Sequence, residues 1–288
     1  MLWNGRTVWR TGSWTPEAYE PARRTGVVDL DTEAGDNLLE IRVASFGDIN
    51  AGLTESFHVG DYAQLLSARS ADVTLNVFLF GCLFIMGIYH LGLWAYRRSD
   101  VTPLWFGIIS ILLATRGLVY GSAFLADLLP WLGWEPAMKL GYLTFSATAL
   151  FFALFIRDLF PQVTPRWFRP FAYVGAGGYS LANLLLPTAW YTPALPWFQL
   201  YVGGLGIVVV VVLVLALVRK LAGAALFLSG FLLFFATVVN DILKTNYFIP
   251  TPYLSSVGLL AFLVFQSLVM LKKFTSAFAD SERYSQHR

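Results

Sequence analysis

Residues 197–218 read WFQLYVGGLGIVVVVVLVLALV and contain no charged side chain. A helix needs about 20 apolar residues to cross the hydrocarbon core of a bilayer, so this stretch alone favours a membrane protein. The 288-residue chain agrees, with 57% hydrophobic residues, 13% charged residues and a mean hydropathy of +0.61. Soluble globular proteins carry about 25% charged residues. Water is therefore not the solvent expected around most of this chain.

Apolar runs of similar length recur along the chain. The seven predicted spans are residues 73–94, 104–125, 140–156, 171–186, 197–218, 221–239 and 253–271. An odd number of crossings puts the two ends of the chain on opposite sides of the membrane. The single cysteine, Cys82, lies inside the first run and can form no internal disulfide.

Lysine and arginine residues predict the orientation, because they are in excess in cytoplasmic loops. The segments on one side hold Arg97, Arg98, Arg157, Arg166, Arg169, Arg219, Lys220, Lys272, Lys273, Arg283 and Arg288. The loops on the other side hold only Lys139 and Lys244. This asymmetry predicts that residues 1–72 lie outside and that the end of the chain lies in the cytoplasm.

The first seventy residues have a different pattern. Short alternating runs at residues 6–9, 26–30, 38–44 and 53–59 are typical of strands, and turn residues such as Asn4-Gly5 and Gly35-Asp36-Asn37 separate them. We therefore expect an all-β domain over residues 1–70. Residues 1–72 have six basic and eleven acidic side chains, whereas the remainder has fourteen and seven. The net charge of +2 averages these unlike parts, so it does not indicate a nucleic-acid-binding face.

The β region resembles the second half of galactose-binding-like jelly rolls. The residues that carry the resemblance are Trp3-Asn4-Gly5, Gly12, Pro21, Val28-Asp29-Leu30 and the run from Gly35 through Leu38-Leu39-Glu40 to Val43. The resemblance implies a partial β-sandwich whose first half precedes Met1. The absence of a signal-peptide core in residues 1–10 favours the same expectation, and the alternative is that the first span itself translocates the seventy-residue tail.

The apolar region resembles bacterial seven-transmembrane receptors with diverse intracellular signalling modules. The motifs are Asn240-Asp241-Ile242-Leu243, Thr251, Gly258, Phe262, Gln266-Ser267 and Lys272-Lys273-Phe274. The resemblance implies a multi-pass protein of the bacterial plasma membrane with seven helices over residues 71–273. Residues 274–288 would then begin a cytoplasmic signalling helix.

The resemblance also implies a function, a ligand and partners. The expected function is a receptor's sensor and transducer region, which couples an extracytoplasmic small ligand to a cytoplasmic signalling module that is absent from this chain. The jelly roll suggests a carbohydrate ligand, and a second copy of the chain is a further expected partner. The alternative function is a small-solute or ion transporter, although we find neither an inverted repeat nor paired interrupted helices.

Two charged residues inside the apolar runs are candidates for a transmembrane switch, because ionisable groups are costly in lipid. Arg116 lies in the second run, and Asp241 follows the sixth run beside Asn240. One reading is that Arg116 pairs with Asp241 or Asn240 and forms the switch. The other reading is that Asp241 caps a helix at the water boundary while Arg116 bonds carbonyl groups.

Other polar residues in the spans predict helix packing. Asn76, Asn183 and Gln266 are candidates for hydrogen bonds between helices, and His90 is more typical of a packing residue than of a proton relay. His58, His90 and His287 lie in different compartments, so we expect no metal site or histidine-based triad. No phosphate-binding or nucleophile motif occurs either. We therefore expect no enzyme activity and no cofactor in this chain.

Overall fold

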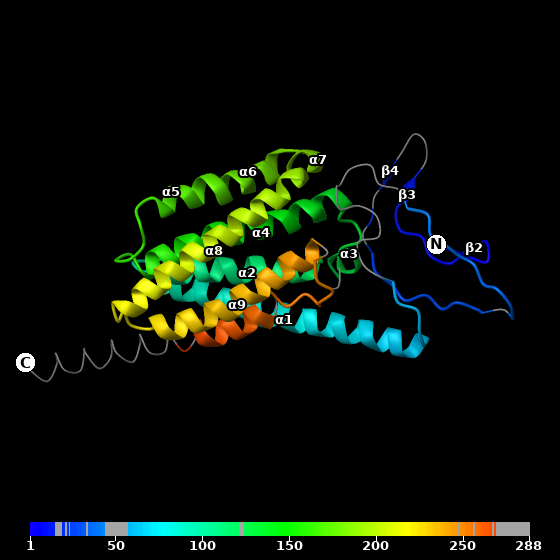
Figure 1. The fold of residues 1–288 in the computed structure, drawn as a ribbon, viewed down its shortest axis with the longest axis horizontal. Coiled ribbons are helices and arrows are strands. Elements are labelled where there is room, and N and C mark those ends of the chain that lie inside the picture. Colours follow the sequence, from blue (N-terminus) through cyan, green and yellow to red (C-terminus); the bar gives the residue numbers. More distant parts are fainter. Residues whose placement is uncertain are drawn as a thin grey trace, which may run out of the picture.

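The protein is a bundle of long helices that lie side by side, with a small β region at one end (Figure 1). The computed structural model describes residues 1–14, 19–20, 22, 24–32, 34–43, 57–120, 124–246, 248–255, 257–266 and 268. The part of the chain so described contains five helices that are long and apolar enough to cross a membrane. They are α1 (Tyr62–Tyr96), α2 (Thr102–Tyr120), α4 (Trp134–Leu159), Thr188–Val218 and α9 (Ala224–Thr245). The expectation of a mostly helical membrane protein is confirmed.

The span Thr188–Val218 combines three elements. It starts with α7 (Thr188–Tyr191) and the 3₁₀ turn η2 (Thr192–Ala194) and continues as α8 (Leu195–Val218). Within the bundle, α2 packs between α1 and α4, and α8 packs against α9. The end of the bundle next to the strands is called the sheet end below. The opposite end, where α1, α4 and α8 terminate near Arg97, Arg157 and Arg219, is called the basic end.

The fourth predicted run, residues 171–186, is helical but is divided into short elements. These are α5 (Phe168–Ala172), the π-helical segment η1 (Tyr173–Gly177) and α6 (Gly178–Leu185). A side chain at Gly175 would overlap the ring of Tyr201, whose hydroxyl donates a hydrogen bond to the carbonyl of Phe171 at 3.2 Å. The wide π turn thus occurs where a ring from α8 approaches the backbone closely.

The seventh predicted run is helical over Val257–Gln266, which is shorter than a full span. Residues 253–255 and Leu268 of that run are also described, whereas its other residues and the predicted cytoplasmic helix over 274–288 lie outside the described residues. Other boundaries differ from expectation. The helix α1 begins at Tyr62, well before residue 73. Asp61 caps this start, because its side chain accepts a hydrogen bond from the Gln64 amide at 3.0 Å.

The ends of the second and sixth runs bear on the functional candidates. The second run was expected to reach residue 125, and the structure describes α2 up to Tyr120 and the short helix α3 (Phe124–Leu128). The sixth run was expected to end at Asn240-Asp241, but α9 continues to Thr245. The side chains of Asn240 and Asp241 therefore project from the last turns of α9.

The β region contains short strands. They are β1 (Leu2–Trp3), β2 (Arg6–Thr7), β3 (Ser13–Trp14), β4 (Tyr19–Glu20) and β5 (Leu39–Glu40). Three of them form an antiparallel sheet in the order β2-β1-β5, and β3 pairs with β4. The expected turn at Asn4-Gly5 is confirmed, since both residues have positive φ, of 50° and 79°.

The turn and the second predicted loop meet in space. The side chain of Asn4 accepts a hydrogen bond from the Leu38 amide at 2.8 Å and donates one to Asn37 at 2.9 Å. The expected strand at residues 26–30 is wrong, because no described residue pairs with it. Alternation predicts the two faces of a strand, but a strand also requires a hydrogen-bonded neighbour. Residues 53–56 of the last expected strand lie outside the described residues, and residues 57–59 are not in a strand.

Candidate functional site

Asp241 links the last turns of α9 to the start of the last described helix, Val257–Gln266, which is called the final helix below. Its carboxylate oxygens accept hydrogen bonds from the backbone amides of Leu254 at 2.7 Å and Ser255 at 3.0 Å. The first amides of a helix have no partner within the helix, so a carboxylate in this position caps it and complements its dipole. Asp241 therefore fixes the start of the final helix to α9.

Asn240 makes a second link beside the first. Its amide nitrogen donates to the carbonyl of Pro252 at 3.0 Å, and its amide oxygen accepts from the hydroxyl of Thr251 at 2.8 Å. The same nitrogen also donates to Asp241 at 3.1 Å. We call Asn240, Asp241 and Thr251, with the backbone of residues 252–255, the α9 clamp. It joins two consecutive helices through hydrogen bonds that leave little freedom of register.

Arg116 lies on α2 and has different partners. Its guanidinium donates to the carbonyl of Gly141 on α4 at 3.0 Å. It also lies over the rings of Tyr120 and Phe145, each 4.7 Å from the guanidinium carbon to the ring centroid. Two aromatic faces and one carbonyl are the kind of surroundings that hold a weakly hydrated cation away from water.

The hypothesis that Arg116 pairs directly with Asp241 or Asn240 is not met by the geometry. In the described part of the chain, no hydrogen bond or ion pair joins Arg116 to Asp241 or Asn240. The reason is packing, because α2 contacts mainly α1 and α4, while the Asp241 carboxylate is occupied by amides of the final helix. The role of Arg116, Asn240 and Asp241 as a transmembrane switch stays a prediction.

The three residues predicted to bridge helices differ in their surroundings. Asn183 of α6 is fully buried and donates to the hydroxyl of Ser146 on α4 at 3.1 Å, so it does bridge two helices. Asn76 instead donates to the carbonyl of Asp72 in its own helix at 2.8 Å. Gln266 is 1% exposed, and neither atom of its amide has a hydrogen-bond partner among the described residues.

His90 and the potential metal ligands complete the predicted candidates. The ring of His90 is buried, lies 4.5 Å from the Phe106 centroid and contacts the carbonyl of Met86 at 2.8 Å. These contacts are typical of a histidine that packs between helices. Among the residues with described positions, no three His, Cys, Asp or Glu side chains are grouped so that they could hold a metal ion.

Charged side chains make three further contacts at the sheet end. Arg69, near the start of α1, reaches Asp127 of α3 at 3.3 Å. Lys139 and Glu135 pair at 3.4 Å along α4, and Glu135 accepts from Thr188 of α7 at 3.4 Å. These links tie the connecting segments at the sheet end to the long helices.

Comparison with known proteins gives the family of the helical part. Residues 73–273 match the family described as 7TM diverse intracellular signalling. The chain belongs to this family. The match covers the bundle and the α9 clamp and leaves out the β region. No curated protein and no solved structure matches the chain.

Of the two readings of the sequence, the geometry agrees with the one in which Asp241 caps a helix and Arg116 bonds a carbonyl group, although the sequence did not name the partner residues. The partners of Arg116 and Asp241 include the Gly141 carbonyl and the Leu254 and Ser255 amides. Backbone groups are present at every position, so no residue type marks them. The aromatic rings around Arg116 did carry a signal, because Tyr120 follows Arg116 by four residues on one helix face.

Proposed function

We propose that the chain is the sensor and transducer region of a receptor in a bacterial plasma membrane. In this proposal it couples an extracytoplasmic ligand to a cytoplasmic signalling module. The family supports the proposal, since its description joins seven transmembrane helices to intracellular signalling. The five long apolar helices support a multi-pass topology. Catalysis would belong to the signalling module and not to this chain.

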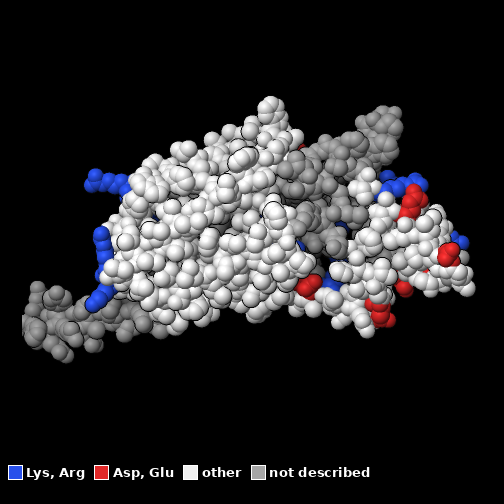
Figure 2. All heavy atoms as spheres, in the orientation of Figure 1, with Lys and Arg blue, Asp and Glu red and all other residues white. Residues whose placement is uncertain are grey.

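The topology in this proposal has seven spans with residues 1–72 outside. The fourth span consists of α5, η1 and α6, and the seventh starts at the α9 clamp. Charge supports the orientation, because on the face shown in Figure 2 the basic end carries Lys and Arg without visible Asp or Glu, whereas the sheet end carries charges of both signs. The excess of Lys and Arg on the cytoplasmic side is the general rule for membrane proteins.

The observation that carries the proposal is the α9 clamp. Four hydrogen bonds of 2.7–3.0 Å join Asn240 and Asp241 to residues 251–255. A shift of α9 at the sheet end would therefore move the start of the final helix with it. That helix leads toward the basic end, where the signalling module would be attached. A ligand can drive the shift only through different affinities for the two arrangements.

The aromatic core near the basic end supports the same mechanism. Phe262 of the final helix lies among Phe106, Phe152, Phe227 and Phe234, with centroid distances of 5.2–6.5 Å. Ring contacts have broad geometric preferences compared with hydrogen bonds. The final helix can accordingly be fixed at its start and still change its packing along its length. Carbohydrate is the ligand class that the jelly-roll resemblance favours, and a second copy of the chain is a further proposed partner.

A spin-label experiment tests the transducer role. Labels at Arg219→Cys and Leu268→Cys, in a Cys82→Ser background, report the distance between α8 and the final helix at the basic end. The protein is reconstituted in liposomes, and a panel of mono- and disaccharides is added outside. A sugar that binds should shift the distance, and Asp241→Ala should reduce the shift. Transport of the bound sugar into the liposomes, or binding with no shift, would contradict the receptor function.

A double-mutant cycle tests the proposed switch. Arg116→Ala and Asp241→Ala are measured singly and together for their effect on the same distance shift. If the two groups act on one element, the double variant should differ from the sum of the single variants. The matched control pairs Asp241→Ala with Arg157→Ala at the basic end, which should be additive. Additivity in both pairs would remove the switch while leaving the receptor function intact.

A further inference from the structure

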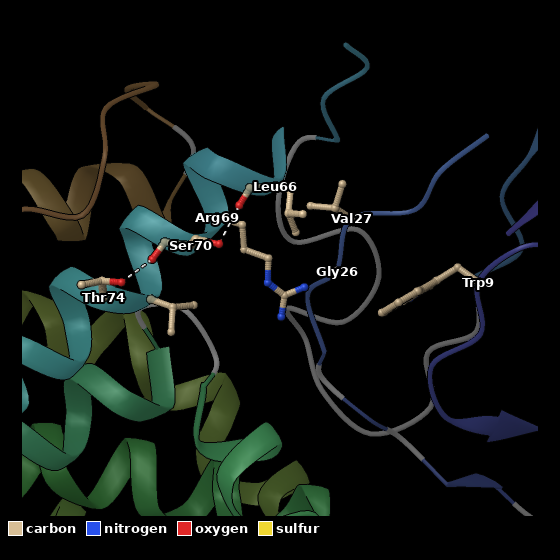
Figure 3. Close-up of a pocket in the computed structure, with 8 residues that line it drawn as sticks. Trp9, Gly26, Val27, Leu66, Arg69, Ser70 and Thr74 are labelled. Carbon is tan, nitrogen blue, oxygen red and sulfur yellow. Dashed lines mark hydrogen bonds between the residues drawn. The ribbon is translucent and has the colours of Figure 1, made fainter. Parts of the chain in front are cut away.

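A cleft of about 370 Å³ lies between the β region and the start of α1 (Figure 3). One wall is formed by Trp9, Gly26 and Val27. The other wall is one face of α1, formed by Leu66, Arg69, Ser70, Val73 and Thr74. A small molecule in this cleft would therefore contact both the β region and a membrane-spanning helix.

Arg69 is the charged residue in the lining of this cleft. Its guanidinium extends from α1 toward the segment that carries Gly26, as Figure 3 shows. The hydroxyls of Ser70 and Thr74 donate to carbonyls of their own helix at 2.9 and 2.7 Å. They therefore offer acceptors and not donors to a ligand. A ligand in the cleft would meet one cation and would place an anionic group on it.

Trp9 gives the opposite wall its shape. Its indole lies against Gly26 so closely that a side chain at residue 26 would overlap the ring. The glycine therefore allows the outer edge of the indole to come close to the backbone at the cleft, with Val27 and Leu66 as further apolar lining. An indole in the wall of a cleft can pack against a ring of a ligand, either stacked or edge to face. The lining as a whole fits a small molecule with a ring and an acidic group.

The ion pair of Arg69 shows what binding would change. Arg69 contacts Asp127 of α3 at a single distance of 3.3 Å, and the two side chains are 29% and 42% exposed. Exposed pairs of this kind are worth about 0–1 kcal/mol. A carboxylate on the ligand can bond the guanidinium at two points and with shorter distances. The ligand and Asp127 would compete for the same cation.

We propose that the cleft between Trp9 and Arg69 binds a small ring-containing carboxylate, which takes Arg69 from Asp127. Binding would thereby release α3 from α1 and fasten the β region to α1. The inference deepens the proposed function and rests on it, because residues 62–72 must stand outside the membrane. With the span starting at Val73, Arg69 lies about 6 Å beyond it at 1.5 Å per residue. An anionic headgroup of a lipid could supply the same chemistry, and the experiment separates the two.

Saturation-transfer NMR on the full chain in phosphatidylcholine nanodiscs tests the proposal. The probes are benzoate and glucuronate, each paired with its neutral analogue, benzamide and glucose. We expect the carboxylates to bind and the neutral analogues to bind about tenfold more weakly. Arg69→Gln and Trp9→Ala should each weaken carboxylate binding about tenfold. Arg6→Gln, a matched change on β2 away from the cleft, should leave it unchanged.

Asp127→Asn provides a readout that a merely structural role of Arg69 would not give. It removes the competitor, so carboxylate affinity should rise severalfold while the affinity of the neutral analogues stays constant. Equal binding of carboxylates and neutral analogues, or full binding by Arg69→Gln, would overturn the proposal. A thermal unfolding curve for each variant shows whether the bundle is intact.

Anionic lipid gives the last arm. The titrations are repeated in nanodiscs that contain phosphatidylglycerol. Unchanged carboxylate affinity supports a soluble ligand. Loss of binding that Asp127→Asn does not restore would assign the cleft to a lipid headgroup and overturn the proposal. These experiments measure binding in the cleft, whereas the spin-label experiment measures the movement of the final helix. A negative result in the first can therefore be distinguished from a negative result in the second.

Discussion

The two halves of the bundle are held together by different forces. Near the sheet end, directional bonds join the helices, as between Asn240 and Pro252, Arg116 and Gly141, and Asn183 and Ser146. Near the basic end, buried phenylalanines from α2, α4, α9 and the final helix pack on one another. The basic-end half also has a directional bond, from the Trp105 indole on α2 to Asp158 on α4 at 2.9 Å, but buried rings make up most of its core.

This difference bears on how a bundle can be stable and still transmit a signal. In lipid, helices gain little from hydrophobic burial against each other, so packing and hydrogen bonds decide their association. Hydrogen bonds lose strength steeply with distance and angle, whereas contacts between rings change more gradually. In the proposed mechanism the sheet-end half would carry a displacement of α9 to the final helix, and the ring contacts of the basic-end half would let that helix change its packing as it moves.

The largest expected effect comes from the aromatic half. Phe262→Ala removes a ring that is 1% exposed and contacts rings from three other helices. A large-to-small change of this kind costs about 3–5 kcal/mol, which equilibrium unfolding in mixed micelles would measure. Phe78→Ala is the control, because Phe78 is 60% exposed and should cost about 0.5 kcal/mol or less. Equal losses would mean that the phenylalanine cluster does not hold the basic-end half.

The α9 clamp should contribute less to stability and more to signalling. Asp241→Ala leaves the amides of Leu254 and Ser255 without their cap, and loss of a capping side chain costs about 1–2 kcal/mol. The same unfolding measurement should show that Asp241→Asn, which keeps one acceptor, loses about half as much. A loss for Asp241→Ala as large as that for Phe262→Ala would reverse the comparison between the two halves.

A smaller effect is expected where α4 meets α6. Ser146→Ala removes the acceptor of both Asn183, at 3.1 Å, and Ser180, at 2.9 Å. Hydrogen bonds between membrane helices average about 0.6 kcal/mol each, so the free energy of unfolding should fall by about 1 kcal/mol. Ser229→Ala is a matched control, because the Ser229 hydroxyl bonds a carbonyl within α9. If both variants lose the same amount, the contact between helices adds nothing.

The smallest effect is expected at Asn76. Among the described residues, its side chain bonds the Asp72 carbonyl of its own helix and no other group, so Asn76→Ala should change the free energy of unfolding by about 0.5 kcal/mol or less. The same unfolding assay checks this expectation. A larger loss would show that Asn76 contacts another molecule, and crosslinking from this position would then reveal a second copy of the chain on α1.

The sequence predicted the candidate site in part. It located Asp241 and Arg116 because a charge inside an apolar run is conspicuous, and it located Asn183 for the same kind of reason. It did not predict that α9 continues past Asp241 to Thr245, since helix ends depend on the cap that tertiary contacts supply. Nor did it distinguish Asn183, which bridges two helices, from Asn76, which does not. Both are single amides in apolar runs, and only their neighbours differ.

The sequence by itself determined the membrane class, the family and the Asn4-Gly5 turn. These depend on properties that add up along the chain, namely hydrophobicity over about 20 residues and the backbone preferences of two adjacent residues. Only the tertiary structure decided that Arg116 bonds Gly141, that Asp241 bonds the Leu254 and Ser255 amides and that Trp9 and Arg69 line the same cleft. Those partners are largely backbone groups or residues distant in the chain, and helix packing selects them from many chemically equal alternatives.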